Sequence, residues 1–319
     1  MTSRFKVGNA PCSWGTLEFE SAQCEQIPFD RMLDELRDTG YTGTELGDWG
    51  YMPTDAAALR GELQRRDLVM LGAFVPVSLR DSAAHAPGVA TAVKTARLLA
   101  AVATQPAPYL VLADNNGTDA VRTRLAGRVP ADAGLSAQEW TTFARGAEQI
   151  ARSVLEETGI RTVFHHHCAG FVERPEEIAR LLEMTDPKLL GLVFDTGHYT
   201  YGSGTTEADV RDGLRRFADR IWYLHLKDCD PRVARSAREQ EWDYFTALRH
   251  GVFCELGKGQ VDFRAVFEWI REHHYEGYVL VEQDVLPGMG SPAESARRNR
   301  EYLRSLEPVF AQTAAEGAK

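Results

Sequence analysis

The stretch LLGLVFDTGH, residues 189–198, decides the fold of this chain. It is a short apolar run that stops on a carboxylate, Asp195, followed by a Thr-Gly-His turn. Three other apolar runs stop in the same way on residue types that bind metals, at His165, His225 and Glu282. His165, Asp195 and His225 are 30 residues apart, and Glu282 follows 57 residues later. Because about 30 residues make one strand and one returning helix, these four strand ends are expected to meet at one rim of a parallel sheet.

Apolar runs and helical stretches alternate along the whole chain. We predict eight strands, at residues 6–10, 42–47, 68–77, 109–113, 161–166, 189–195, 221–226 and 278–282. The predicted helices cover residues 29–39, 55–66 with Thr54 as the cap, 88–103, 136–157, 176–184, 207–218, 261–274 and 291–306. This α/β alternation predicts a (β/α)8 TIM barrel, a single domain over residues 1–319, with a frayed tail after about residue 307. A doubly wound open sheet is the competing architecture, but no G-x-G-x-x-G motif follows the first strand.

Two segments lack a clear pattern. The stretch 118–135 is rich in Ala, Arg, Gly and Asp, and we interpret it as an extended loop after the fourth strand. The stretch 229–260 is too long for a simple connection between a strand and a helix, so we interpret it as a candidate lid.

Composition excludes several classes of protein. A net charge of -10 argues against a nucleic-acid surface, which needs a clustered basic face. The sequence contains no run of 18 apolar residues, so we predict no membrane span. The first residues lack the apolar core of a signal peptide. We therefore expect a cytoplasmic globular protein with no membrane or nucleic-acid partner, and a homo-oligomer is possible. Five scattered cysteines without a CxxC pair fit reduced thiols.

The four strand ends form a candidate metal site. Asp195 has an ordinary alternative role as a helix N-cap, and His225 as a packed core histidine. Strand alternation, however, puts His225 and Lys227 on one side and leucines on the other. Glu282 closes a buried strand, which is costly for a carboxylate unless it is paired or bound to a cation. For Lys227 the alternative is an ion pair with Asp228 or Glu45.

Alternation also separates the three consecutive histidines. His165 and His167 share one side of the strand, and His166 faces the other. We assign His165 to the metal, and His167 either to the substrate or to a position behind the metal ligands, with Glu173 as a rival ligand. Asp284 shares the face of Glu282 as a loop residue. Two imidazoles and two carboxylates suit Mn²⁺ or Co²⁺, which we favour, or Zn²⁺ or Fe²⁺, better than Ca²⁺.

At these residues the chain resembles the sugar-phosphate isomerase/epimerase-like group of xylose-isomerase-type TIM barrels, and within it the inosose dehydratases. The resemblance covers most of the chain. It is carried by Gly43-Thr44-Glu45-Leu46-Gly47, by His165-His166-His167 with Gly170 and Glu173, by Asp195-Thr196-Gly197-His198, by His225-Leu226-Lys227-Asp228, by Leu256 to Phe263, and by Val281-Glu282-Gln283-Asp284. The broad group usually has a Glu where this chain has His165, and its epimerases use that Glu with the one on strand eight as two bases. The departure therefore favours a lyase over a two-base epimerase.

The resemblance implies a metal-dependent dehydratase that removes water from a cyclic polyol ketone such as 2-keto-myo-inositol. The metal ligands would be His165, Asp195, His225 and Glu282, and the candidate catalytic residues Glu282, His198 and Lys227. His167, Glu45, Trp14 and Asp228 would contact the substrate. The alternatives are a metal-dependent sugar or sugar-phosphate isomerase/epimerase, and a non-catalytic polyol-binding barrel. A phosphate pocket would need several basic groups near the last strands, where the sequence offers only Lys258.

Overall fold

A computed structural model describes residues 6–15, 27–205, 209–286 and 289–316, with side chains up to residue 306. Within these ranges, no helix is long and apolar enough to cross a membrane.

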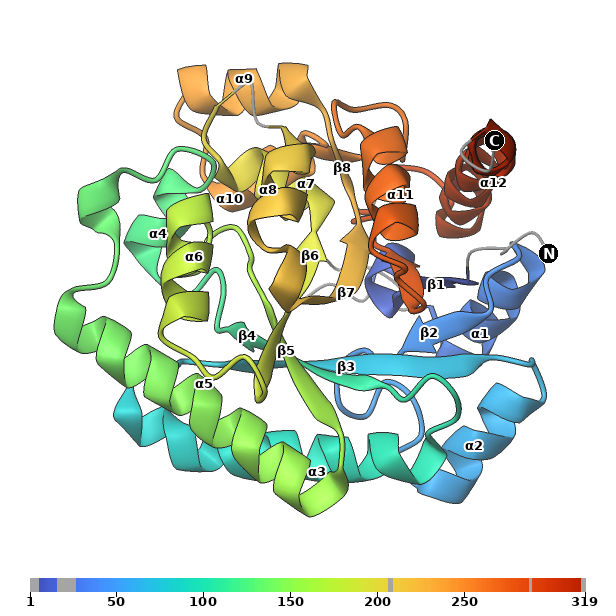
Figure 1. Ribbon diagram of the computed structural model, residues 1–319, viewed down its shortest axis with the longest axis horizontal. Coiled ribbons are helices and arrows are strands. Elements are labelled where there is room, and N and C mark those ends of the chain that lie inside the picture. Colours follow the sequence, from blue (N-terminus) through green and yellow to red (C-terminus); the bar gives the residue numbers. More distant parts are fainter. Residues whose placement is uncertain (1–5, 16–26, 206–208, 287–288, 317–319) are drawn as a thin grey trace.

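Eight parallel strands close into a barrel, as predicted (Figure 1). Around the barrel the strands lie in the order β1-β10-β7-β6-β5-β4-β3-β2. Their bounds are β1 Lys6–Asn9, β2 Gly43–Glu45, β3 Val69–Val77, β4 Tyr109–Asp114, β5 Arg161–His165, β6 Leu190–Asp195, β7 Ile221–Leu226 and β10 Tyr278–Val281. Because β10 pairs with both β1 and β7, the sheet has no free edge, which excludes the open doubly wound alternative.

Helices surround the barrel (Figure 1). The outer layer consists of α1 Phe29–Asp38, α2 Ala56–Gln64, α3 His85–Val102, α5 Ala137–Thr158, α6 Pro175–Glu183, α8 Val210–Arg216, α11 Phe263–Glu272 and α12 Pro292–Glu316. Short 3-10 turns lie at η1 Pro11–Trp14, η2 Ser82–Ala84, η3 Ala131–Ala133 and η4 Ala218–Arg220. The outward strand residues, Phe164 and Phe194 among them, pack against these helices in one apolar core.

Local signals set several helix ends. Ser136 and Glu139 form a capping box at the start of α5, and Gly159 ends that helix with a φ of 72°. Pro175 occupies the first turn of α6. The predicted cap of α2 was one residue off, because the side chain of Asp55, not Thr54, accepts from Ala58 N.

The segment expected as an extended loop after β4 contains a helix. Asp119 caps α4, Ala120–Leu125, by accepting from the amides of Val121 and Arg122. The Arg122 guanidinium is fully buried and pairs with both oxygens of Glu177 in α6, at 2.9 and 2.8 Å. This bidentate pair ties the segment to the outer helices, so the loop interpretation was wrong.

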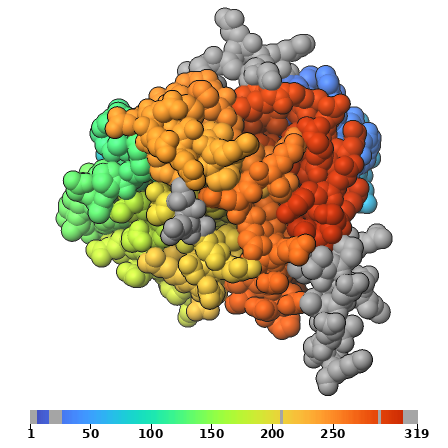
Figure 2. Space-filling model, turned by 90° about the horizontal axis from the view of Figure 1, so that it is seen from above, coloured from blue at the N-terminus to red at the C-terminus, as the bar shows by residue number. Residues whose placement is uncertain are grey.

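The candidate lid is a folded cap. Residues 228–254 contain α9 Pro231–Glu239, α10 Tyr244–Arg249 and a small antiparallel pair, β8 Asp228–Cys229 with β9 Phe253–Cys254. These elements share a second apolar cluster with residues after β5 and β6, including Cys168 and Tyr201. Figure 2 shows the cap in orange, beside the red surface of the C-terminal part of the chain. In this structure the segment forms a packed wall over the barrel rim.

Inside the barrel, apolar side chains fill the space below the rim. Leu71, Val111, Val163, Val193, Tyr223 and Leu280 belong to this inner cluster. Gly8 fits closely there, since a Cβ on it would come too close to Leu71 Cδ1, and the leucine would have to move. The closed floor leaves the carboxyl ends of the strands as the place where polar side chains gather.

Candidate metal centre and active site

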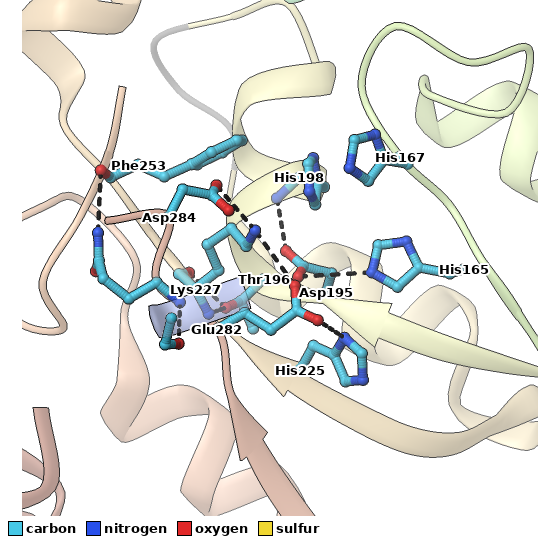
Figure 3. A network of polar contacts seen from close by, with 12 residues as sticks. His165, His167, Asp195, Thr196, His198, His225, Lys227, Phe253, Glu282 and Asp284 are labelled. Carbon is cyan, nitrogen blue, oxygen red and sulfur yellow. Dashed lines mark hydrogen bonds and ion pairs between the residues drawn. The ribbon is translucent and has the colours of Figure 1, made fainter. Parts of the chain in front are cut away.

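The four predicted ligands meet at the barrel rim. His165, Asp195, His225 and Glu282 each offer one ligand atom, and these atoms all lie within 4.8 Å of one another. The strand register explains the convergence, because Asp195 and His225 are Cα partners in neighbouring strands. Figure 3 shows the four side chains pointing toward one another from four different strand ends.

Asp195 combines the two roles that its sequence position allows. Its Oδ1 accepts from His198 N at 2.7 Å and thereby caps α7, Thr196–Gly202. Its Oδ2 is buried without a hydrogen-bond partner among the described residues and lies 3.8 Å from His165 Nε2. Burial raises the pKa of Asp195 to about 7.

The helix predicted over residues 207–218 is α8, which covers Val210–Arg216. Residues 207 and 208 lie outside the described ranges.

The three histidines divide as strand alternation predicts. His165 faces the ligand cluster, and burial lowers its pKa well below the usual range. His166 faces outward, where its ring lies 5.7 Å from Phe194 and its Nε2 accepts from Asp195 N at 3.2 Å. His167 lines the pocket.

His225 lies between two carboxylates. Its Nδ1 is 3.1 Å from Glu282 Oε1, and its Nε2 is 3.2 Å from Glu45 Oε1. Burial disfavours the charged imidazole, but Glu282 and Glu45 outweigh burial and raise the pKa of His225 to about 10. Glu45, expected at the substrate, is therefore placed to orient His225.

Lys227 has partners other than the two that the sequence suggested. Its Nζ lies 3.2 Å from Glu282 Oε2 and 3.2 Å from Asp284 Oδ2, and 4.9 Å from the centre of the Phe253 ring. Burial would lower its pKa, but Asp284 and Glu282 outweigh that effect and keep the pKa well above the usual value. Lys227 is therefore a fixed cation beside the ligand cluster. Gly197 leaves room for it, since a Cβ there would lie 2.6 Å from Lys227 Cγ.

A pocket opens onto this cluster. Its lining includes the predicted residues Glu45, His165, His167, Lys227 and Glu282, and it adds Ala10, Pro11, Cys12, Gly47, Asp48, Phe74, Tyr244 and Asp284.

Sequence reasoning missed Asp48 and Tyr244 as pocket residues. Asp48 follows the second strand end and could have been found by the same rule as the metal ligands. Tyr244 lies in the cap, where no strand pattern indicates a direction.

His198 lies behind His167 and is not part of the pocket lining. The two ring centres are 3.8 Å apart. His198 Nε2 is buried without a hydrogen-bond partner among the described residues, while its Nδ1 accepts from Cys168 N at 3.3 Å.

Trp14 and Asp228, which we expected to contact the substrate, contact other parts of the protein. Trp14 is buried in the outer core and donates from Nε1 to Glu35 Oε2 at 2.8 Å. Asp228 accepts four backbone amides, from Cys229, Gly257, Gly259 and Val261, and so organises the turn after β7. Neither residue lines the pocket.

Glu173, the rival candidate for a metal ligand, also has structural hydrogen bonds. It accepts from Gly127 N at 2.7 Å and from Ala169 N at 2.8 Å, and it is not part of the ligand cluster. Burial raises its pKa to about 7.

The residues at the rim fit a divalent cation. Among the described residues, Asp195 Oδ2 is buried without a hydrogen-bond partner. Potential ligand atoms of His165, His225 and Glu282 lie close to it. One bound ion would give all of these buried polar atoms a partner. The donors are nitrogen and oxygen, a set that suits borderline transition ions. If all four residues bound one ion, an ion that takes five or six ligands would keep coordination positions for a substrate.

Comparisons with known proteins agree with this geometry. A model of the xylose isomerase-like TIM barrel family matches residues 27–306. The inosose dehydratase of Geobacillus kaustophilus is 30% identical over 302 residues, covering 95% of this chain and 94% of that enzyme. The inosose dehydratase of Clostridium tetani is 28% identical over 308 residues, covering 96% and 98%.

Solved structures show the same fold at lower identity. An L-ribulose 3-epimerase superimposes with a TM-score of 0.67 at 17% identity, covering 99% of this chain and 98% of that one. The probable 3-DHS dehydratase AsbF from Bacillus anthracis gives 0.65 at 14% identity, covering 94% and 98%. On the family match and the near full-length relatives, the chain belongs to the xylose isomerase-like TIM barrel family and, within it, to the inosose dehydratase-like hydro-lyases.

Proposed function

We propose that this chain is a divalent-metal-dependent dehydratase that eliminates water from a cyclic polyol ketone, most simply 2-keto-myo-inositol. One observation carries the proposal: two imidazoles and two carboxylates converge within 4.8 Å beside the buried cation Lys227. The named relatives are inosose dehydratases, which supplies the substrate class.

His165, Asp195, His225 and Glu282 would hold the ion. With Nε2 of His225 paired to Glu45, Nδ1 is the nitrogen left to face it. When bound, the ion supplies Lewis-acid stabilisation of negative charge on a substrate oxygen. Mn²⁺ and Co²⁺ are the ions we favour for this donor set, with Zn²⁺ and Fe²⁺ as alternatives.

The protein's own groups would move the protons. An elimination needs a base for the proton beside the carbonyl and an acid for the departing hydroxyl. Glu282 Oε2 is the carboxylate oxygen that faces Lys227, 3.2 Å away, and it is our candidate base. Lys227 lines the pocket as an ammonium and can donate to an oxygen of the substrate. His198 lies behind His167, so we assign it a supporting role.

The absence of a fifth-strand carboxylate argues against two-base epimerisation. His165 occupies that strand end, and its Nε2 faces Asp195 within the ligand cluster. An imidazole that binds a metal through one nitrogen normally donates from the other, so it has no lone pair for a proton. A lone base, Glu282, suits elimination.

The product decides the reaction class. Protein loaded with Mn²⁺ or Co²⁺ is incubated with 2-keto-myo-inositol in D₂O, and the product is examined by NMR. We expect a dehydrated dione. An inverted ketone that carries solvent deuterium, with no water lost, would make the chain an epimerase. Binding of the ketone without turnover would support a non-catalytic barrel.

A further inference from the structure

Two histidines share the backbone of one residue at the pocket wall. His167 Nδ1 lies 2.6 Å from the carbonyl oxygen of Cys168. The amide nitrogen of the same residue lies 3.3 Å from His198 Nδ1. In Figure 3, His167 and His198 lie side by side above His165.

These contacts fix both tautomers. A carbonyl oxygen only accepts, so Nδ1 of His167 must carry the hydrogen. An amide N–H only donates, so Nδ1 of His198 must offer its lone pair. In the neutral rings, His167 therefore exposes an acceptor at Nε2, whereas His198 carries its hydrogen on Nε2.

Packing fixes the ring orientations as well. The His198 ring lies between His167, 3.8 Å away, and Phe253, 4.7 Å away. The His167 ring also contacts the ring of Tyr244 in the cap, with the ring centres 5.7 Å apart. A ring held in this way cannot turn to present the opposite nitrogen without losing its bond to Cys168.

Of the two histidines, His167 offers the nitrogen, Nε2, that a substrate can reach. His167 lines the pocket, and its Nε2 has no hydrogen-bond partner among the described residues. His198 is buried away from the pocket lining. Of the two rings, only His167 is therefore placed to touch a substrate.

We propose that His167 is a specificity-determining residue that recognises one hydroxyl group of the substrate, with Nε2 as acceptor, and that Cys168 and His198 are positioning residues that hold its tautomer. This proposal rests on the proposed function for the nature of the substrate, a polyol ketone. It assigns His167 hydroxyl recognition and leaves proton transfer to Glu282 and Lys227.

The tautomer is tested first, by NMR of the imidazole nitrogens in protein loaded with diamagnetic Zn²⁺. We expect a protonated Nδ1 and an unprotonated Nε2 for His167, assigned by the signals lost in His167→Gln. His250 serves as an internal reference, because its Nδ1 also lies 2.8 Å from a carbonyl oxygen, that of Thr246, outside the pocket. A protonated Nε2 on His167 would overturn the proposal.

Hydroxyl recognition is tested with a cycle of variants and substrate analogues. Inososes that lack one hydroxyl each are assayed with the wild-type protein and with His167→Phe, which keeps a ring without nitrogen. For the complete substrate we expect kcat/KM of His167→Phe to fall about tenfold, the size of one lost hydrogen bond, mostly through KM. For one deoxy analogue the two proteins should differ by less than about twofold.

Two controls make the result specific. His167→Gln, whose amide can donate to the Cys168 carbonyl and still offer an oxygen, should recover part of the loss. His250→Phe should leave kcat/KM unchanged. Equal losses for every analogue would overturn the proposal. Failure of the proposed function has a different signature, since the wild-type protein would then turn over no inosose while the tautomer result would stand.

Discussion

At the residue scale, the convergence of the four candidate metal ligands could be predicted because a strand end fixes both position and direction. Asp195 and His225 point inward by alternation, and the register places them at the same level. The groups that support them could not be predicted. Glu45 meets His225 across 180 residues of sequence, and Cys168 acts on two histidines through its backbone. Sequence patterns carry no signal for a backbone contact or for pairing across the barrel.

The two oxygens of Asp195 allow its roles to be separated. Asp195→Asn keeps an oxygen that can accept from His198 N, so the cap of α7 should survive. The lost charge should weaken metal binding by more than about 100-fold, beyond the effect of removing a group that only orients a ligand. Asp195→Ala should lose the ion and, in addition, about 1 kcal/mol of stability with the cap. Bound metal by mass spectrometry and urea unfolding measure the two effects.

His166→Ala provides the matched control for this experiment. It removes an imidazole beside His165 that faces Phe194, away from the cluster. The variant should keep one ion per chain while losing stability from the buried contact. Loss of the ion in His166→Ala, with His165→Ala still loaded, would show that the side-chain assignment of β5 is wrong.

Glu45→Gln tests the orientation of His225. Its carboxylate accepts from the nitrogen of His225 that faces away from Glu282. Loss of such a partner typically lowers metal affinity about 10–100-fold, so we expect weaker binding with unchanged stoichiometry. Competition with a chelator of known affinity gives the number. An unchanged affinity would mean that Glu45 contacts the substrate only.

At the scale of elements, the strands and long helices could be predicted because they bury a periodic face. The helices α4, α7, α9 and α10 could not. Every residue of α7 is buried, so its sequence shows no polar side, and α4 has six residues with two arginines. The cap formed by α9, α10 and the β8–β9 pair shows no strand-helix alternation, since it packs as a unit on the barrel rim. These irregular elements supply Tyr244 to the pocket and close its side.

The pair of Arg122 and Glu177 predicts a pH dependence for the anchoring of α4. Burial raises the pKa of Glu177, but Arg122 outweighs burial and holds it below the usual 4.5. A depressed pKa stabilises the fold above the unfolded value and loses that contribution as pH falls through the folded value. Glu177→Gln should therefore cost about 3 kcal/mol near pH 7, and the difference from wild type should shrink below about pH 4.5. Urea midpoints of chelated proteins at several pH values would show it. A difference that does not change with pH would assign the effect to packing.

At the scale of the whole molecule, the ligand cluster connects distant parts of one closed sheet. Its members come from β5, β6, β7 and the end of β10, and β10 also pairs with β1 to close the barrel. An ion bound there links segments that are more than 100 residues apart in sequence, from His165 to Glu282. Metal binding should therefore stabilise the global fold as well as the site.

Thermal unfolding gives this prediction a magnitude. An ion that binds only the folded chain stabilises it by about 2.7 kcal/mol at a free concentration of 100 times Kd. With an unfolding entropy of about 2.1 cal/mol/K per residue, a chain of 319 residues should gain about 4 °C in Tm over the chelated protein. The gain should continue slowly as free metal rises and should disappear in Asp195→Asn at the same concentration, because that variant lacks the carboxylate whose Oδ2 has no other partner among the described residues. An equal gain in Tm for Asp195→Asn would place the stabilising ion elsewhere. If wild-type protein binds an ion without any gain in Tm, unfolding begins in a part of the chain that the metal does not hold.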